Sequence, residues 1–528
     1  INGSTTVLSL DQFGKFEQEI HKSKAAPVKQ VSTFKPAAVT PIKAKTQTNQ
    51  ISTPVSQNRY QEYGGSQDSG YSSERSTQST PSNMYENRTN YGQSVTSMNV
   101  ALGERGEFVA SEARPLGNRC RVSVSTEDFS NVTERYRFMY TTLEERARAM
   151  DKHLLHIQES ICDTAFINDL QPVGIASPEL VWVSGRICNE SHEGKINKTS
   201  ISAGRRVHLD ISELSEYSLF PGQIVLVQGI NASGVNMVAK RIIEGQTLPR
   251  PTSTPASLLE MHYSRKVQNG KPLSIRIASG PYTTSDNLNY SPFQDLLMGI
   301  LNDKPDVVIL LGPFVDSNHP MLKSGEEIRI DSRYDDDDEE DENSLKKNKK
   351  RKTDLHSATY ETLFRERIGK DGFTRFFNNE EEEEGVLGSD DSRIATQFIL
   401  VPSVNDLFHE LVFPQPPLGD RDVLKSSFFA DDLGKLDIPY SKESDGPLKR
   451  VHLLSNPSMF RINEVLFGLC SNDLLFSLSS DEVSGISEIR LTRLSNHILQ
   501  QQSFHPQFPV PPMNNNVITP VWFFLCLC

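Results

Sequence analysis

Four short apolar runs in the second half of the chain have the pattern of buried strands. They are Leu273–Ala278, Asp306–Gly312, Gln397–Pro402 and Arg450–Ser455. A helical pattern over Pro292–Asn302 separates the first two runs. Apolar strands that alternate with helices are typical of a parallel sheet covered on both faces. We therefore predict an α/β domain over residues 256–512, with its chemistry in the loops just beyond the carboxyl ends of the strands.

Between Val173 and Ile243 the pattern changes to short β segments rich in β-branched residues and separated by Gly and Asn. Around five such strands in one compact stretch predict a small β-barrel of the OB type over residues 166–250. OB barrels bind single-stranded nucleic acid through aromatic side chains on a basic groove. Trp182 is the candidate aromatic side chain here. A barrel that serves only to dock another protein is equally compatible with the pattern.

A single apolar stripe at spacings of three and four residues predicts a long helix from about 131 to 161, within a helical lead-in over 116–165. The stripe consists of Tyr136, Tyr140, Leu143, Ala147, Met150, Leu154, Ile157 and Ile161. We favour a helix that packs onto the barrel that follows it. The alternative is a coiled-coil contact with a partner.

Residues 22–115 are rich in Ser, Thr, Gln, Asn and Pro and contain few large aliphatic side chains. Such a segment cannot bury enough surface to offset its ordering entropy, so we predict a long disordered N-terminal linker. Thr-Pro pairs at Thr40, Thr53 and Thr80 are possible phosphorylation sites for proline-directed kinases, although such pairs are common in any linker of this composition. Residues 1–21 have a faint helical pattern, and we interpret them as the remnant of an N-terminal helical module.

A charged insertion over residues 323–393 interrupts the predicted α/β domain. Its acidic runs cover 335–342 and 380–384, and such blocks stay solvated. The basic run between them has the composition of a nuclear localisation signal, and the alternative is a loop that pairs with the acidic runs. The basic residues are Lys346, Lys347, Lys349, Lys350, Arg351 and Lys352. From the basic run we expect the protein to act in the nucleus. Thr359–Ile368 is apolar enough to be a helix that returns to the fold.

The overall composition excludes several classes of function. The net charge of −13 argues against a protein that wraps nucleic acid, because neutralising phosphates needs an excess of Lys and Arg. The six cysteines form no CxxC pair, so we predict neither a zinc site nor a disulfide framework. The apolar patch at Val521–Cys528 is too short to span a bilayer, and we expect no membrane partner.

The ends of three predicted strands carry the candidate chemistry. Their sequences are IASGPYTTSD, LLGPFVD and LVPSVND. This layout resembles that of the calcineurin-like metallophosphoesterases, which place Asp-x-His, Gly-Asp-x-x-Asp and Gly-Asn-His-Asp/Glu after successive strands. In such sites two divalent metals about 3.5–4 Å apart polarise the phosphate and activate water. The resemblance implies a phosphoesterase-like frame for the α/β domain.

The metal ligands of that frame are replaced in this chain. The first motif loses its Asp and its His, the second its bridging Asp, and the third its Asn and its His. The degenerate positions are Ala278, Gly280, Pro313, Asp316, Val404, Asn405 and Asp406. Two isolated carboxylates, Asp316 and Asp406, cannot make a dinuclear site, and we interpret them as loop or capping residues. We therefore expect an inactive calcineurin-like fold with no catalytic residue, no metal and no cofactor.

An OB barrel followed by a phosphoesterase-like domain without metal ligands resembles the B subunits of replicative DNA polymerases. Five blocks in order narrow the resemblance to the B subunits of DNA polymerase alpha, over roughly residues 110–325 and 355–512. They are SELSEYSLFPGQIVLVQGIN, SGPYTTSDNLNY, PDVVILLGPFVD, VPSVNDLFHELVFPQPP and SMFRINEVLFGLCSNDLLF. The final residues, 513–528, depart from it, and we interpret them as an aberrant tail.

The resemblance implies a non-catalytic scaffold in the polymerase alpha–primase complex that supports primer synthesis. In that family the two folded domains grip the zinc-binding C-terminal domain of the catalytic subunit, and the primase subunits belong to the same complex. We expect DNA contact to be indirect or weak. The alternatives are an active metal-dependent phosphoesterase and a single-strand-binding OB module of another replicative polymerase.

Overall fold

The structure is a computed structural model. It describes residues 80–98, 120–124, 142–189, 199–247, 252–264, 267–268, 270, 272–325, 328–331, 355–379, 396–419, 436, 450–486, 489–509 and 517–518. Several predictions lie outside these residues: the N-terminal module over 1–21, the Thr-Pro pairs at Thr40 and Thr53, the basic run over 346–352 and the acidic runs over 335–342 and 380–384.

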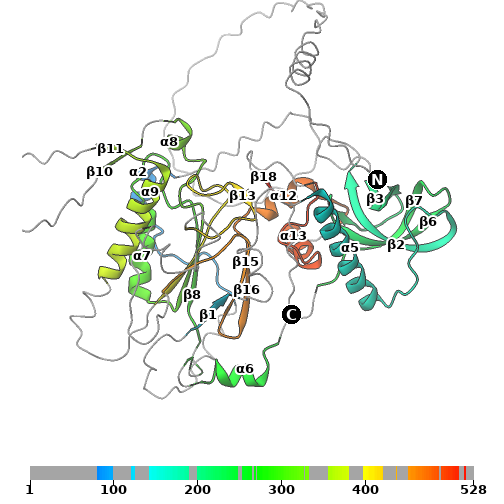
Figure 1. Ribbon diagram of the computed structural model, residues 1–528, viewed down its shortest axis with the longest axis horizontal. Coiled ribbons are helices and arrows are strands. Elements are labelled where there is room, and N and C mark those ends of the chain that lie inside the picture. The colour runs from blue at the N-terminus through cyan, green and yellow to red at the C-terminus, as the bar shows by residue number, and fades with distance from the viewer. Residues whose placement is uncertain are drawn as a thin grey trace, which may run out of the picture. The chain divides into compact units, whose positions relative to one another are not determined.

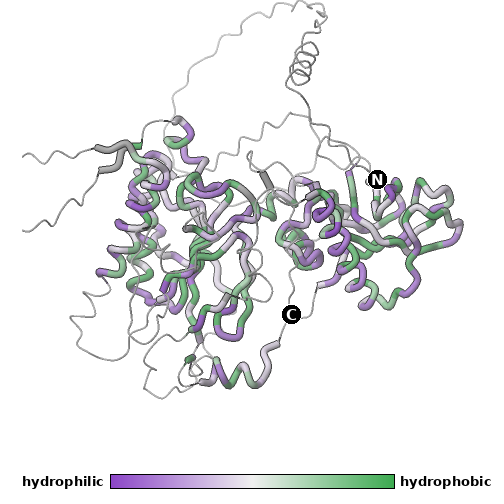
Figure 2. Tube along the Cα trace, viewed as in Figure 1, coloured by the Kyte–Doolittle hydropathy of each residue, from purple (hydrophilic) through white to green (hydrophobic). Residues whose placement is uncertain are grey.

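A four-stranded parallel sheet forms the centre of the α/β domain. Its strands follow the order β14 (Val451–Leu453), β12 (Gln397–Val401), β9 (Val307–Leu311) and β8 (Ile275–Ser279). The four strands predicted from the apolar runs are therefore confirmed. Their side chains alternate between two cores, because successive residues of a strand point to opposite faces. The hydrophobic stretches along these strands are visible in Figure 2.

Helices cover one face of this sheet. Val308, Leu310 and Phe398 pack there against α7 (Ser291–Asp303) and against α9 (Tyr360–Phe364), which continues into the π-helix η1 (Arg365–Thr374). The hydroxyl of Thr359 caps α9 by accepting the amide hydrogen of Thr362. The predicted helix over Thr359–Ile368 is confirmed as a helical segment that returns to the core. The insertion expected over 323–393 therefore does not lie wholly outside the fold, because residues 355–379 belong to it.

A three-stranded antiparallel sheet covers the other face, where the strands of the parallel sheet present Ile309 and Ile399. Its strands are β1 (Val122–Val124), β15 (Ser458–Ile462) and β16 (Val465–Leu469). The side chain of Gln397 donates to the carbonyl of Cys120 at 2.8 Å, which fixes the start of β1. The expectation of a purely helical lead-in over 116–165 was wrong here, because β1 takes its conformation from β15, which lies more than 300 residues away in the sequence.

The second folded module is a closed five-stranded barrel. Its strands are β2 (Ser177–Asn189), β3 (Thr199–Ala203), β4 (Arg205–Asp210), β7 (Asn236–Ile243) and β6 (Ile224–Asn231), in that order around the barrel. Val183, Ile187, Ile201 and Val227 are buried in its interior. The predicted barrel within residues 166–250 is confirmed.

Helix α5 (Leu143–Ala165) packs on the outside of this barrel (Figure 1). Ile157 and Ile161 contact Ile224 and Leu226 of β6, which confirms the favoured interpretation of the apolar stripe. The helix begins at Leu143, later than the predicted residue 131, because Thr142 and Glu145 form a capping box. The predicted residues before Thr142 lie outside the described part of the chain.

The segment Thr80–Met98, here called the strap, has a defined position on the α/β domain. It contains helix α2 (Ser82–Glu86), and its Ser82 amide donates to Asp286 at 2.9 Å. The expectation of disorder throughout residues 22–115 therefore does not hold for the strap. Its composition is that of a linker, but polar contacts to another part of the chain hold it, and these cannot be read from local composition.

The remaining elements join the barrel to the end of the chain or are short. They are β5 (Ser218–Leu219), α6 (Pro255–Glu260), α8 (Pro320–Lys323), β10 (Arg329–Asp331), β11 (Leu355–Ser357), β13 (Val412–Phe413), α12 (Leu474–Asp481), β17 (Val483–Ser484), α13 (Arg490–Gln500) and β18 (Val517–Ile518). β18 lies in the tail expected to be aberrant and pairs in parallel with β13. Within the described residues, no helix is both long enough and apolar enough to cross a bilayer.

Candidate functional site

The loops that follow β8, β9 and β12 meet at the carboxyl edge of the parallel sheet. The amide of Gly280 donates to the carbonyl of Leu311 at 2.9 Å, and the amide of Gly312 donates to the carbonyl of Val401 at 2.8 Å. The structure therefore brings the three motif-bearing loops together, as the topology of a parallel sheet requires. All seven degenerate positions belong to this cluster or directly flank it.

Asp406 lies at the centre of the cluster and binds backbone amides. Its carboxylate accepts hydrogen bonds from the amides of Phe314 at 2.5 Å, Val315 at 3.0 Å and Ser403 at 2.7 Å. Burial raises the pKa of Asp406 to about 7, although the three amide hydrogen bonds act in the opposite direction. This carboxylate fastens the loop after β9 to the loop after β12, and its acceptor sites are taken up by the protein itself.

The other retained carboxylate, Asp316, also has a local role. It accepts a hydrogen bond from the amide of Asn318 at 2.9 Å, the geometry of a loop-forming Asp. Burial raises the pKa of Asp316. The neighbouring backbone is tied to the third loop, since the amide of Ser317 donates to the carbonyl of Asn405 at 2.9 Å. Both retained carboxylates are thus loop residues, as the sequence suggested.

The loops are packed so closely that a side chain at Gly280, the position of the first motif's His, does not fit. A Cβ atom at Gly280, which matches the His of the first motif, would overlap the carbonyl oxygen of Pro313. A Cβ atom at Gly312 would overlap the Asp406 carboxylate and approach the amide of Ser403 at 2.7 Å. Placing a His at Gly280 would therefore require the backbone around Pro313 to move.

The nearby imidazoles do not complete a metal site either. His319 contacts the carbonyl of Thr284 at 2.8 Å, and His409 contacts the carbonyl of Pro416 at 2.8 Å. Val404 is buried, and Ala278 packs against the core of the sheet. Across the described ranges, no group of three or more His, Cys, Asp or Glu side chains is arranged to hold a metal ion. The residues present do not fit the dinuclear centre that the phosphoesterase resemblance would imply.

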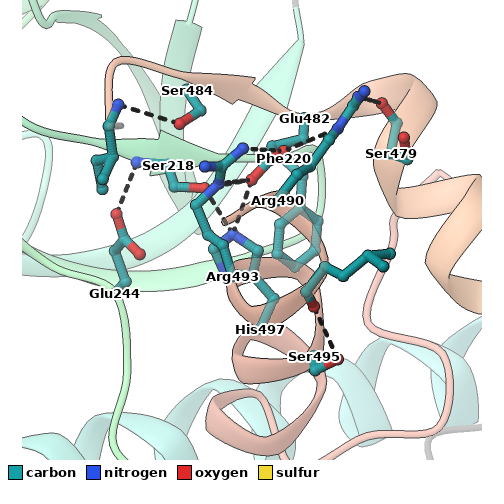
Figure 3. A network of polar contacts seen from close by, with 12 residues as sticks. Ser218, Phe220, Glu244, Ser479, Glu482, Ser484, Arg490, Arg493, Ser495 and His497 are labelled. Carbon is teal, nitrogen blue, oxygen red and sulfur yellow. Dashed lines mark hydrogen bonds and ion pairs between the residues drawn. The ribbon is translucent and has the colours of Figure 1, made fainter. Parts of the chain in front are cut away.

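A second buried polar cluster lies where the barrel meets α12 and α13 (Figure 3). We call it the junction network; it consists of Ser218, Glu244, Glu482, Arg493 and His497. Arg493 holds Glu482 with two hydrogen bonds, from Nε at 2.5 Å and from Nη2 at 2.9 Å. Strands β5 and β17 pair beside it, and Phe220, Leu478 and Leu494 form its apolar floor.

The junction network resembles a Ser-His-Glu triad only superficially. Ser218 Oγ lies 2.7 Å from His497 Nε2, and Glu482 approaches the same nitrogen at 3.5 Å instead of Nδ1. The Ser218 hydroxyl donates a hydrogen bond to the Glu482 carboxylate at 2.6 Å. The side chain of Ser218 is buried. A catalytic triad needs the carboxylate on the far nitrogen and an accessible hydroxyl. The geometry is that of a structural clamp.

The charge state of the clamp follows from its hydrogen bonds. Burial tends to raise the pKa of Glu482, but hydrogen bonds from Arg493, His497 and Ser218 lower it well below its usual range. Glu244 accepts the amide of Ser218 at 2.7 Å, and burial raises its pKa. An ionised Glu482 paired with Arg493 therefore joins α12 to α13, and the hydrogen bond from Ser218 links this pair to the barrel side.

The barrel does not present its candidate aromatic side chain for stacking. Trp182 is half-buried and packs with Ile224 and Leu226 beneath α5. Sequence reasoning also did not identify the junction network or the Asp286 and Asp295 contacts of the strap. The contacts that join Ser82 to Asp286, Tyr85 to Asp295 and Ser218 to Glu482 span more than 200 positions in the sequence, and no local motif marks them.

Comparisons with known proteins give the context of these sites. A family model of the OB domain of the DNA polymerase alpha B subunit matches residues 148–245. A model of the DNA polymerase alpha/epsilon B subunit matches residues 275–365 and 366–522. The first match covers the closed barrel and identifies it as an OB domain, as predicted.

Curated relatives agree with these matches. The DNA polymerase alpha B subunit of Bos taurus is 29% identical over 448 residues, which cover 82% of this chain and 60% of the relative. The protein of that name from Schizosaccharomyces pombe is 29% identical over 390 residues, covering 71% and 56%. The one from Saccharomyces cerevisiae is 27% identical over 428 residues, covering 78% and 51%. The chain thus spans about 60% or less of the length of these relatives.

Proposed function

The chain belongs to the family of DNA polymerase alpha B subunits, and from this we propose that it is a non-catalytic accessory subunit of the DNA polymerase alpha–primase complex. In this role it tethers the catalytic subunit and supports the initiation of DNA replication. We also propose that its α/β domain is a phosphoesterase-like fold without metal ligands. The parallel sheet with motif-bearing loops at its carboxyl edge supports that assignment.

The observation that carries the proposal is the closure of these loops around Asp406. A dinuclear phosphoesterase needs open coordination positions and ligands from several loops. Here the loops donate their amides to one carboxylate, and Pro313 occupies the space in front of Gly280. A site of this kind stabilises a fold and has no group placed to activate water.

The proposed partners are the zinc-binding C-terminal domain of the polymerase alpha catalytic subunit and, within the complex, the primase subunits. The buried junction network supports a scaffold role, because through Ser218 it links the OB domain to α12 and α13 of the α/β domain. A scaffold made of two modules needs such a fixed relation to hold a partner in one orientation. DNA contact is indirect or weak in this proposal.

Co-purification tests the scaffold role. The tagged full chain is expressed in cells of its own source, recovered from nuclear extract and identified with its partners by mass spectrometry. We expect the polymerase alpha catalytic subunit and both primase subunits. As a control, an Arg493→Met variant keeps every loop of the parallel sheet but weakens the clamp, and we expect it to recover less of the catalytic subunit. Recovery of none of these subunits by the unmodified chain would contradict the proposal.

A phosphodiesterase assay tests the proposed lack of catalysis. With bis-p-nitrophenyl phosphate and either Mn²⁺ or Zn²⁺, we expect no turnover above that of the metal alone. Metal-dependent turnover that Asp316→Asn abolishes would instead establish an active phosphoesterase. Asp481→Asn serves as the matched control, because Asp481 lies in α12, outside the strand-end loops.

We further propose that the basic run over 346–352 directs nuclear import, since its composition is that of a nuclear localisation signal. A fluorescent fusion of the full chain should accumulate in the nucleus. Replacing the six Lys and Arg residues with Ala should move it to the cytoplasm, whereas replacing the acidic run over 335–342 with Ser and Asn should not. Unchanged nuclear accumulation of the first variant would contradict this assignment.

A further inference from the structure

Polar contacts, with little apolar burial, hold the strap (Thr80–Met98) on the α/β domain. No residue of α2 is buried, and Met84, Val95 and Met98 are exposed. The hold depends on two carboxylates of the domain, Asp286 and Asp295. A segment with few buried apolar contacts belongs to the least stable part of a fold, so a local change of charge is enough to shift its position.

Asp295 of α7 anchors the middle of the strap. Its carboxylate accepts hydrogen bonds from the Tyr85 hydroxyl and from Arg88 Nη2, both at 2.7 Å. The Arg88 guanidinium also lies over the rings of Tyr85 at 3.7 Å and Tyr91 at 4.9 Å. Arg88 is the only Lys or Arg in the sequence of the strap, and its guanidinium forms an ion pair with Asp295.

Asp286, in the loop after β8, anchors the start of the strap. Its carboxylate accepts the amide of Ser82 at 2.9 Å and the hydroxyl of Ser82. The carbonyl of Thr80 accepts the amide of Ser285 at 3.1 Å. The hydroxyl of Ser82 is the main cause that lowers the pKa of Asp286, so this anchor is charged at neutral pH. The sequence from 280 to 295 contains no Lys or Arg.

Thr80 lies directly beside this anchor and is exposed. Pro81 follows it with extended backbone at φ −66° and ψ 154°. Thr-Pro in an exposed, extended stretch is the minimal substrate of a proline-directed kinase. The strap thus combines an accessible modification site with an anionic anchor two residues away.

We propose that Thr80 is a phosphorylation site whose modification releases the strap from the α/β domain. In the reaction, Thr80 Oγ1 attacks the γ-phosphorus of ATP, and a new P–O bond forms there. The bond from that phosphorus to the β,γ-bridging oxygen breaks, ADP leaves, and the hydroxyl proton passes to solvent. The inference concerns the strap alone and does not depend on the proposed scaffold role.

The release follows from charge. A phosphothreonine carries about −1.5 to −2 charges at pH 7, and beside a carboxylate it disrupts by like-charge repulsion. Here the phosphate would be added two residues from the Ser82–Asp286 hydrogen bonds, while the strap's own cation already pairs with Asp295. The repulsion acts on the Ser82–Asp286 hydrogen bonds and on the Thr80–Ser285 backbone bond. Loss of these contacts frees the start of the strap and leaves α2 held by Asp295 alone.

Limited proteolysis of the full chain measures the release. Arg88 is the only tryptic site within the sequence of the strap, and its contact with Asp295 protects it while the strap is docked. The chain is phosphorylated with a proline-directed kinase and ATP, and modification of Thr80 is verified by mass spectrometry. We expect cleavage after Arg88 to become about tenfold faster. Hydrogen exchange in the peptide 80–98 should rise in parallel.

Two variants separate the proposed mechanism from other effects. Thr80→Ala keeps every other Ser-Pro and Thr-Pro pair, and after the same kinase treatment its cleavage should be unchanged. Asp286→Asn keeps an acceptor for Ser82 but removes the charge, so phosphorylation should accelerate its cleavage much less. Failure of the kinase to modify Thr80, or cleavage that phosphorylation leaves unchanged or slows, would overturn the proposal. Equal acceleration in Asp286→Asn would overturn charge repulsion as its cause.

Discussion

The carboxylate of Asp406 accepts three backbone amide hydrogen bonds in a buried site between two loops. With Asp406→Ala, the amides of Phe314, Val315 and Ser403 lose their acceptor in a buried site. An orphaned buried amide costs roughly 1 kcal/mol or more, so we expect the free energy of unfolding to fall by about 3 kcal/mol. Urea denaturation at pH 7.5 measures the change. The control is Asp316→Ala, which orphans the amide of Asn318, and an equal loss in both variants would argue against this role for Asp406.

The same carboxylate makes stability depend on pH. Burial raises the pKa of Asp406 in the folded chain from 3.8 to about 7, so between these values the folded state keeps a proton that the unfolded state releases. The resulting stabilisation is complete below pH 4 and is lost as the pH rises to about 7. Relative to Asp406→Asn, the unfolding free energy of the unmodified chain should decline across this window by on the order of 2–4 kcal/mol. A difference that stays flat or increases with pH would be inconsistent with the raised pKa.

At the residue scale, the sequence predicts that ligand side chains are missing, but it does not predict the contacts that hold these loops together. The absence of a side-chain donor at Gly280 and Pro313 can be read directly from the sequence. The role of Asp406 depends on its burial and on amides from two loops about 90 residues apart, and no spacing encodes that. The exclusion of a His by the carbonyl of Pro313 likewise depends on how closely two loops approach.

At the scale of elements, the ion pair between Arg493 and Glu482 joins α13 to the end of α12, where Ser218 also contacts Glu482. With Arg493→Met, Glu482 remains buried without its cationic partner, and we expect a loss of about 3–5 kcal/mol of unfolding free energy. Combining that change with Glu482→Gln should restore much of the loss. Arg490→Met is the matched control, because Arg490 is 58% exposed and lies 3.9 Å from the same carboxylate; it should cost less than about 1 kcal/mol.

Thermal and urea unfolding of the four chains complete the cycle. An Arg493→Met chain as stable as the Arg490→Met chain would show that the buried pair contributes little. A double variant no more stable than Arg493→Met alone would show that the loss comes from packing of the guanidinium instead of from the unpaired charge.

Elements with their own apolar pattern were predicted, and elements defined by distant partners were not. The four parallel strands, the barrel and the returning helix α9 all carry continuous or periodic apolar residues. By contrast, β1 is three residues long and pairs with β15, and α2 buries no residue. Their stability comes from contacts across the fold, so local propensity gives no signal for them.

At the scale of the whole molecule, charge sets the limit on direct DNA binding. The chain carries a net charge of −13, and Trp182 packs beneath α5. Two separate modules could be predicted from the change in apolar pattern near residue 250, but the buried contacts between them could not. Because the candidate aromatic side chain is half-buried and the chain as a whole is acidic, we expect the OB domain to be a poor platform for stacking single-stranded bases.

We therefore expect the full chain to bind a 30-nucleotide single strand no more tightly than about 10 µM at 150 mM NaCl, within the range of non-specific binding. Fluorescence anisotropy over a salt series measures both the affinity and the number of phosphates neutralised. Trp182→Ala should leave the affinity unchanged, because the ring faces α5. Nanomolar binding that this substitution weakens would instead assign the OB domain a direct role on the template, and the scaffold would then have to position DNA as well as a polymerase.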